Sequence, residues 1–462
     1  MSAKYSTLRR SDGVLLMQVI SMTPWLSWTT ITQAELKAAQ RLADQQDRGV
    51  RDELGLATIH FIYSDRFFPG TSTQMTRLRY VFFVTAAYEL MRRTGNPTLL
   101  ERELQQIERR TAVQLLETLR SDGIPVERTG VIGRLVAGTR EQPGKPPELL
   151  PSMSYWTALT HWDFLYSEEG SPIRSSIHAD WQLYRRNKGH RGEVDERQPL
   201  FSEPLETAWK DELPKGLAQV GNEKMALRFD LEHWEKDLLI EKLTALQQTG
   251  RDRPALLARL AGQRTRLKDL CSADAPWDKR IRELTADDAE EGSALSRAEQ
   301  AAYLVQICRA AYDVLVARIC VKGRLENAEE VLDRAEEALV ALRRPSAHGR
   351  SVALALEPQT IVGDVVGSEG ERSAAATALR ALVPFLVRVQ DWLRGTDDVS
   401  KLLTSFQQRE RFSKQSNIRA RLVDGRDLRR VWLERQHSTR ASPKPLDYRW
   451  SVVAGLLLPD LA

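Results

Sequence analysis

Hydroxyl and guanidinium groups gather in one short segment that follows a Pro-Gly pair. Ser72 and Thr73 come first, and Arg77 and Arg79 follow a few residues later. A hydroxyl after such a turn can cap a helix, because it accepts a hydrogen bond from one of the first free backbone N–H groups. The same N–H groups, together with an arginine, can hold a phosphate. These four residues are therefore a candidate anion-binding site.

The same groups also fit a structural role. Apolar residues from Met75 to Met91 lie on all sides of a helical projection, which is typical of a helix buried on most of its surface. Because an unpaired charge beside such a helix is costly, each arginine would need a partner. The acidic candidates are Asp65, Glu53 and Glu89. The segment is not a P-loop, because no lysine follows the glycine at the required spacing.

Positive charge is concentrated near the C-terminus. The chain has a formal net charge of +4, whereas residues 409–449 hold twelve basic and five acidic residues, a surplus of +7. Such a concentration is typical of contact with a phosphate backbone, and it favours a nucleic acid, DNA in the first place, as a partner. The candidate contacts are Arg419, Arg421, Arg426, Arg429, Arg430 and Arg435.

Two other interpretations of this basic segment stay open. It can be a solvated surface, or it can dock against the acidic remainder of the same chain. We expect residues 428–435 to form a short helix with Leu428, Val431 and Trp432 facing inward.

Composition indicates an ordinary globular protein. Of the 462 residues, 42% are hydrophobic and 28% are charged, and no apolar run approaches the length needed to cross a membrane. The three cysteines, Cys271, Cys308 and Cys320, form no Cys-x-x-Cys pair, which fits a reducing compartment. The histidines do not gather. We expect a cytoplasmic protein without a metal site or a cofactor.

Helical periodicity dominates the chain, so the fold class is mainly α with a few short strands. Helices are predicted at 33–46, 75–91, 99–119, 152–166, 231–248, 253–273, 296–321, 325–343 and 373–393. Strand-like runs are 57–63, 130–136 and 351–356. Polar and glycine-rich breaks divide the chain into predicted domains at 1–190, 205–345 and 369–462.

A winged-helix-like unit is one arrangement of the N-terminal half. Helices at 99–119 and 152–166 would flank a wing formed by residues 130–139. The basic residues facing DNA would then be Arg128, Arg134 and Arg140. Many three-helix domains share this layout, so the pattern carries little specificity.

Several motifs resemble an uncharacterised bacterial family known as a domain of unknown function. They are WLSW at 25–28, DELG at 52–55, FPGTST at 68–73, TRxRY at 76–80 and PLDYRW at 445–450. The resemblance implies a gene near helicase-like and phospholipase-D-like genes in antiviral defence loci. It assigns no chemistry to any residue.

No complete catalytic motif is present. The sequence and the resemblance together predict an accessory, non-catalytic subunit of an antiviral defence complex, which contacts nucleic acid and a helicase or nuclease partner. One alternative is an enzyme or a phosphate- or nucleotide-binding protein with its site near Ser72. Another is a pure protein scaffold.

Overall fold

The structure is a computed structural model that describes most of the chain after residue 52. It covers residues 53–94, 100–139, 149–166, 206–209, 213–222, 224–248, 250–366, 373–415, 417–440 and 442–462, and the single residues 142, 144, 145, 147, 174, 178 and 181. Gln46–Ala462 forms one compact unit. The helix predicted at 33–46 and the motif at 25–28 lie outside the described residues.

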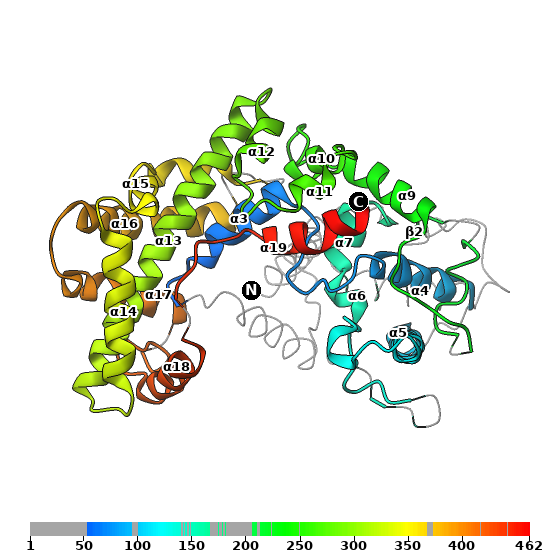
Figure 1. The fold of residues 1–462 in the computed structure, drawn as a ribbon, viewed down its shortest axis with the longest axis horizontal. Helices are drawn as coiled ribbons and strands as arrows, with labels where there is room; N and C mark the ends of the chain where they lie inside the picture. Colours follow the sequence, from blue (N-terminus) through cyan, green and yellow to red (C-terminus); the bar gives the residue numbers. More distant parts are fainter. Residues whose placement is uncertain are drawn as a thin grey trace, which may run out of the picture. The chain divides into compact units, whose positions relative to one another are not determined.

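The described residues are mainly helical, as predicted (Figure 1). The first half contains α3 (Ala57–Phe67), α4 (Tyr80–Thr94), α5 (Leu100–Ser121), η2 (Val126–Arg128), α6 (Pro151–Ser154), α7 (Trp156–His161), α9 (His233–Thr244), α10 (Leu256–Ala261) and α11 (Leu267–Leu270). The second half contains α12 (Lys279–Arg282), η3 (Glu283–Thr285), α13 (Ala289–Lys322), α14 (Ala328–Arg343), α15 (His348–Leu354), η4 (Pro358–Asp364), α16 (Ala374–Arg394), η6 (Val399–Leu402), α17 (Leu403–Lys414) and α18 (Arg426–Thr439). The chain closes with α19 (Trp450–Val452), η7 (Val453–Leu457) and α20 (Leu458–Leu461).

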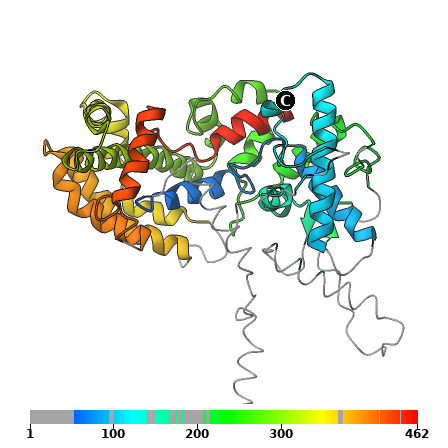
Figure 2. The same cartoon turned by 90° about the horizontal axis from the view of Figure 1, so that it is seen from below.

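Helix α13 is the longest element and organises the second half. It begins after Asp288, whose side chain accepts a hydrogen bond from the N–H of Glu291 and so caps the helix. Its alanines, valines and leucines are buried around most of its circumference, because α14, α15, α16 and α18 all pack against it. Figures 1 and 2 show α14 lying alongside α13.

The strand predictions were wrong. Residues 57–63 belong to α3, and 351–354 belong to α15. Residues 132–136, within the strand predicted at 130–136, form turns. The observed strands are β1 (Leu165–Tyr166) and β2 (Glu206–Thr207), which pair antiparallel with Leu165 opposite Thr207. β1 occupies the end of the helix predicted at 152–166, which is otherwise divided into α6 and α7.

The segment expected to form a wing, 130–139, consists of turns and a single bridge residue, Gly138, among the described residues. The N–H of Gly144 donates to the carbonyl of Ala137 and closes a tight loop there. Arg128 is exposed and Arg134 is half-buried, whereas Arg140 lies outside the described residues. The winged-helix unit stays a prediction.

Contacts join segments that are far apart in the sequence. The hydroxyl of Tyr63 on α3 donates to Asp364 at the end of η4, over 2.8 Å. Near the C-terminus, Tyr448 donates to the carbonyl of Ala298 on α13 over 2.7 Å. These contacts connect residues on both sides of the polar and glycine-rich breaks at which the domains were divided. The three domains stay a prediction.

Within the described part of the chain, every helix is too short or too polar to span a membrane. The same residues contain no group of three or more His, Cys, Asp or Glu side chains placed to hold a metal ion.

Candidate nucleic-acid interface

The segment with Ser72 and Thr73 does not begin a helix. Helix α4 begins at Tyr80, so the two hydroxyls precede it by seven residues or more, and the predicted cap was wrong. The hydroxyl of Ser72 instead accepts a hydrogen bond from the N–H of Gln74, which forms a local turn. The helix start was predicted too early, because Gly70, with a φ of +81°, belongs to a chain reversal and not to the start of a helix.

Arg79 is buried and its hydrogen-bond donors are occupied. Its Nε lies 2.9 Å from a carboxylate oxygen of Glu235, and Nη2 lies 3.2 Å from Glu232. Nη1 donates to the carbonyl of Arg228 over 3.1 Å. Burial raises the pKa of Glu235, and Arg79 opposes that effect. Arg79 thus fastens the start of α4 to the start of α9, with partners that the sequence did not indicate.

Arg77 also serves the fold. Its guanidinium donates to the carbonyls of Thr129 and Arg128, over 3.3 and 3.1 Å. The hydroxyl of Tyr155 accepts the N–H of Thr76 and of Arg77 and donates to the carbonyl of Arg77. The structural interpretation therefore describes Arg77 and Arg79 better than the anion site, although the pairs with Asp65, Glu53 and Glu89 were wrong.

The motifs at 68–73 and 445–450 meet in space. Arg449 Nη1 lies 2.9 Å from a carboxylate oxygen of Asp65 and donates to the carbonyl of Thr71 over 2.8 Å. The rings of Phe68 and Trp450 lie 5.9 Å apart, and both side chains are buried. Two motifs that are far apart in the sequence therefore form one cross-linked corner of the core.

A buried ionic cluster around Arg66 was not predicted from the sequence. Arg66 is fully buried, and Nη2 lies 2.7 Å from Glu291 while Nη1 lies 3.4 Å from Asp364. Arg297 contacts the same Asp364. Each charge has a partner, so the cluster joins α3, α13 and η4. No spacing in the sequence indicated it.

A second buried carboxyl lies between α5 and α6. Glu108 accepts hydrogen bonds from the N–H and the hydroxyl of Ser152, over 2.5 and 3.3 Å. Burial raises the pKa of Glu108 to about 7, although Arg174 and the bonds from Ser152 oppose this effect. The raised pKa makes the stability of the fold depend on pH.

Two of the six tail arginines point into the protein. Arg421 is buried against Glu53. Burial raises the pKa of Glu53, but the opposite effect of Arg421 and Lys414 is larger and holds this pKa below its ordinary value. Arg429 donates to the carbonyls of Arg421 and Val423 over 2.9 and 3.4 Å. Both residues stabilise the corner between α17 and α18.

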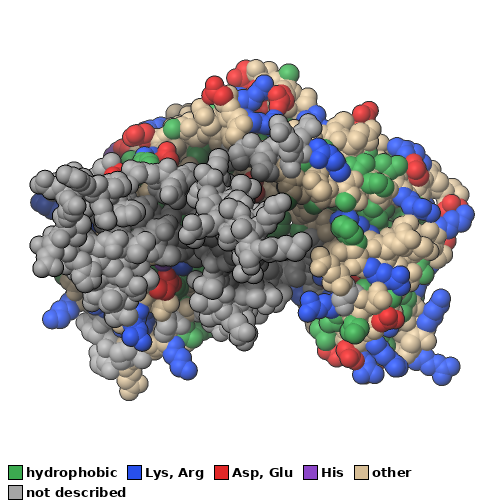
Figure 3. Space-filling model, turned by 180° about the vertical axis from the view of Figure 1, so that it is seen from behind, with side chains coloured by type: hydrophobic (Ala, Val, Ile, Leu, Met, Phe, Trp, Pro, Cys, Tyr) green, Lys and Arg blue, Asp and Glu red, His purple; other side chains and the backbone are tan. Residues whose placement is uncertain are grey.

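The other four tail arginines are exposed. They are Arg419, Arg426, Arg430 and Arg435, and none forms an ion pair within the described part of the chain. Asp424, Asp427 and Glu434 are exposed in the same segment, so the surplus of positive charge at the surface is smaller than the sequence count. Figure 3 shows basic, acidic and apolar side chains mixed at the lower right, the part that holds α14 and α18.

Helix α18 confirms the predicted helix but reverses part of its orientation. Trp432 is buried against the core as expected. Leu428 and Val431, which were predicted to face inward, are exposed. The reason is that the helix turns the face of Arg429, Trp432, Leu433 and Gln436 toward the core, which leaves Leu428 at the edge of that face and Val431 on the opposite side.

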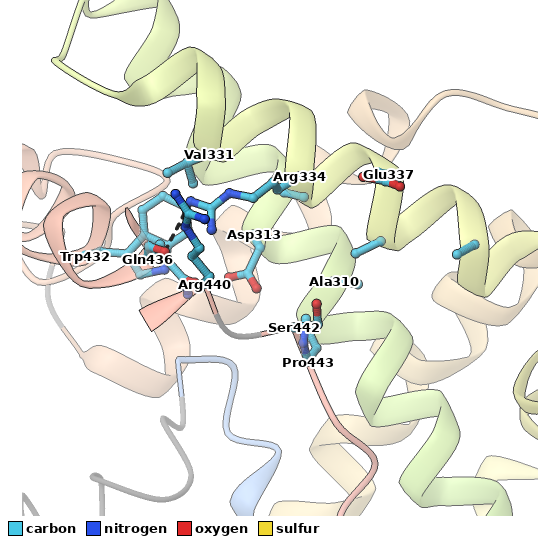
Figure 4. Close-up of a pocket in the computed structure, with 13 residues that line it drawn as sticks. Ala310, Asp313, Val331, Arg334, Glu337, Trp432, Gln436, Arg440, Ser442 and Pro443 are labelled. Carbon is cyan, nitrogen blue, oxygen red and sulfur yellow. Dashed lines mark hydrogen bonds between the residues drawn. The ribbon is translucent and has the colours of Figure 1, made fainter. Parts of the chain in front are cut away.

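A cavity of about 390 Å³ lies where α13, α14 and α18 meet. Figure 4 shows Arg334, Arg440 and Gln436 close together at one end, with Asp313 on the facing helix. Arg334 donates to the carbonyl of Gln436, and Arg440 lies 3.7 Å from Glu330. Both arginines of the cavity therefore have a partner within the fold.

Comparison with known proteins gives one match. Residues 23–165 match the model of a family of unknown function (DUF6361). This range contains the motifs at 68–73 and 76–80 and agrees with the resemblance to an uncharacterised family, whereas the motif at 445–450 and the arginine tail lie outside it. No curated protein and no solved structure matches the chain.

Proposed function

We propose that the protein is a non-catalytic binding subunit that contacts the phosphate backbone of a nucleic acid. The contact is made by its C-terminal corner, which consists of α17, α18 and the segment between them (residues 403–439). The contact residues are Arg419, Arg426, Arg430 and Arg435. In the setting that the family resemblance implies, the protein would act in the cytoplasm as an accessory part of a bacterial antiviral defence complex, with DNA as the favoured nucleic acid and a helicase or nuclease as the protein partner.

One observation supports this proposal most strongly. The four exposed arginines form no ion pair among the described residues and all lie within residues 419–435, whereas other exposed arginines without an ion pair, such as Arg102 and Arg344, are far apart in the chain. A free guanidinium can donate two hydrogen bonds to one phosphate. Each such contact releases counterions and adds to a salt-dependent affinity.

The alternative of a phosphate-binding enzyme has less support. Its site required Arg77 and Arg79, and the guanidinium groups of both donate hydrogen bonds to carbonyls or carboxylates of the protein itself. A pure scaffold would bind neither duplex nor single-stranded nucleic acid, so the same experiment distinguishes it.

The experiment is a titration of the full chain into labelled duplex and single-stranded DNA across a salt series. A variant with Arg419→Glu and Arg430→Glu should bind more weakly, and the slope of log K against log salt should become shallower by about two. Truncation after Gln408 is unsuitable, because it removes the buried Tyr448 and Trp450.

A matched control carries Arg102→Glu and Arg344→Glu. These arginines are also exposed and lie outside the tail, so the control has the same net charge. Its affinity and salt slope should stay close to those of the parent chain. Equal losses in both variants would indicate a general effect of net charge and would contradict the proposal, as would an unchanged slope in the tail variant.

A further inference from the structure

We infer that the C-terminal corner is built for single-stranded nucleic acid, with Phe412 as a platform on which a base stacks. The inference rests on the proposed function and specifies its ligand. It starts from exposed apolar side chains in the same part of the chain, 411–435, as the four exposed arginines. These are Phe412, Ile418, Leu428 and Val431, with exposed fractions of 64%, 76%, 37% and 57%.

The corner is rigid enough to hold these side chains in place. The carboxylate of Glu410 on α17 accepts the N–H groups of Arg421 and Leu422, each over 2.9 Å, and so closes the segment between them. Gln407 donates to the carbonyl of Leu422 over 2.8 Å. Phe412 and Ile418 both belong to this closed segment.

Phe412 is supported from within the protein. The guanidinium of Arg409 lies 5.0 Å from the centre of its ring. Arg409 is itself fixed, because Nε donates to the carbonyl of Leu54 over 2.6 Å. The ring therefore has a cation against it and remains largely open to solvent. An aromatic ring held in this way loses little conformational freedom when a base stacks on it.

Exposed positive charge and exposed apolar side chains alternate along the chain in this corner. An exposed arginine is the chain neighbour of an exposed apolar residue at three places: Arg411 with Phe412, Ile418 with Arg419, and Arg430 with Val431. A single strand presents the same alternation, since each nucleotide carries one phosphate and one base with an accessible face.

This alternation argues against two other ligands. Duplex DNA offers phosphates, but its bases are stacked inside, so it would leave the exposed ring of Phe412 without a partner. An acidic amphipathic helix carries its charged and apolar residues on separate faces, which suits a groove with a charged rim and not interspersed groups. The alternating surface favours the single strand.

The test compares a labelled oligothymidine of about 16 nucleotides with a duplex of the same length. Phe412→Ala in the full chain should lower affinity for the single strand about 10-fold, with an unchanged salt slope, because stacking is lost and no phosphate contact is. Affinity for the duplex should not change. Phe412→Trp should restore single-strand binding, and Leu135→Ala, at another exposed apolar residue, should have no effect.

The outcomes separate this inference from the proposed function. If single strand and duplex bind equally and Phe412→Ala affects neither, the inference is wrong while the backbone contact stands. If neither nucleic acid binds the full chain, both fail. Binding of an acidic helical peptide alone, lost in Phe412→Ala, would make the corner a protein-docking surface and would also overturn the inference.

Discussion

Two arginine-rich regions look equally suited to bind an anion in the sequence, and the structure uses them differently. In the turn before α4, Arg77 and Arg79 are taken up by carbonyls and carboxylates of the protein itself. In the C-terminal corner, Arg421 and Arg429 are taken up in the same way, but four of their neighbours are not. Arginine content therefore indicates where binding is conceivable, and the partners of each guanidinium indicate where it is available.

The same comparison separates stability from binding within a few residues. Arg421 is buried against Glu53, whereas Arg419, two positions earlier, is exposed and unpaired among the described residues. Substitutions in the first region should change the free energy of unfolding. Substitutions at the exposed arginines should change binding and leave the fold intact.

The largest effect is expected at Arg79. Arg79→Ala leaves Glu235 buried without its cationic partner, and the loss of one member of a buried pair costs about 3–5 kcal/mol. Chemical denaturation of the variant and the parent chain would measure this loss in unfolding free energy. Arg102→Ala, at an exposed arginine, should change it by less than about 0.5 kcal/mol. A similarly small effect at Arg79 would mean that the turn does not depend on this pair.

A pH-dependent effect is expected at Glu108. Its pKa of about 7 in the folded chain exceeds the ordinary 4.5, so the folded state holds the proton more tightly than the unfolded chain does. This contribution to stability is fully present below pH 4.5 and is lost as pH rises through about 7, by about 3 kcal/mol at most.

Glu108→Gln keeps an oxygen that can accept the bond from Ser152 and removes the titration. Denaturation of both proteins between pH 4.5 and 8 should therefore show that the variant loses less stability over this range. Parallel curves would show that Glu108 ionises normally in the folded protein.

The pair Arg421 and Arg419 sharpens the comparison within the tail. Arg421→Ala removes charged hydrogen bonds inside the corner and should cost about 1.5–3 kcal/mol in unfolding free energy. Arg419→Ala should leave stability within about 0.5 kcal/mol and weaken binding to single-stranded DNA. Denaturation and a binding titration on both variants give the two readouts. The opposite assignment of effects would break the distinction between buried and exposed arginines.

The smallest effect on stability is expected at Gly70, in the turn at 68–73. Gly70 and Gly123 both have positive φ, +81° and +76°, which costs about 1–2 kcal/mol for a residue with a side chain. A Cβ at Gly70 would also collide with the indole of Trp162, whereas a Cβ at Gly123 meets no atom within 4 Å. Gly70→Ala should therefore lower the melting temperature more than Gly123→Ala. Equal shifts would show that Trp162 yields at no cost.

The sequence predicted the long helices well, because their periodicity is a local property. Residues 296–321 fall inside α13 and 373–393 coincide with most of α16. The β-branched run at 57–63 predicted a strand, but burial on several sides by distant elements makes it part of α3. A short apolar run does not distinguish a strand from a buried helix, so tertiary contacts decide which of them forms.

The candidate sites were less predictable, since partners far apart in the sequence determine them. Nothing near Arg79 indicates that its partners lie at 232–235, and nothing near Arg449 indicates Asp65. The exposure of Phe412 likewise follows from how α17 packs. The sequence located the basic segment but could not separate its structural arginines from its exposed ones.

The central claim is most directly tested by amide hydrogen exchange of the full chain with and without the single-stranded oligothymidine. Local opening governs exchange in turns and helix ends, so a bound strand should slow it where it docks. We predict protection of peptides within 411–435 and no change within 71–80. Protection of the turn at 71–80, with the tail unchanged, would contradict the account.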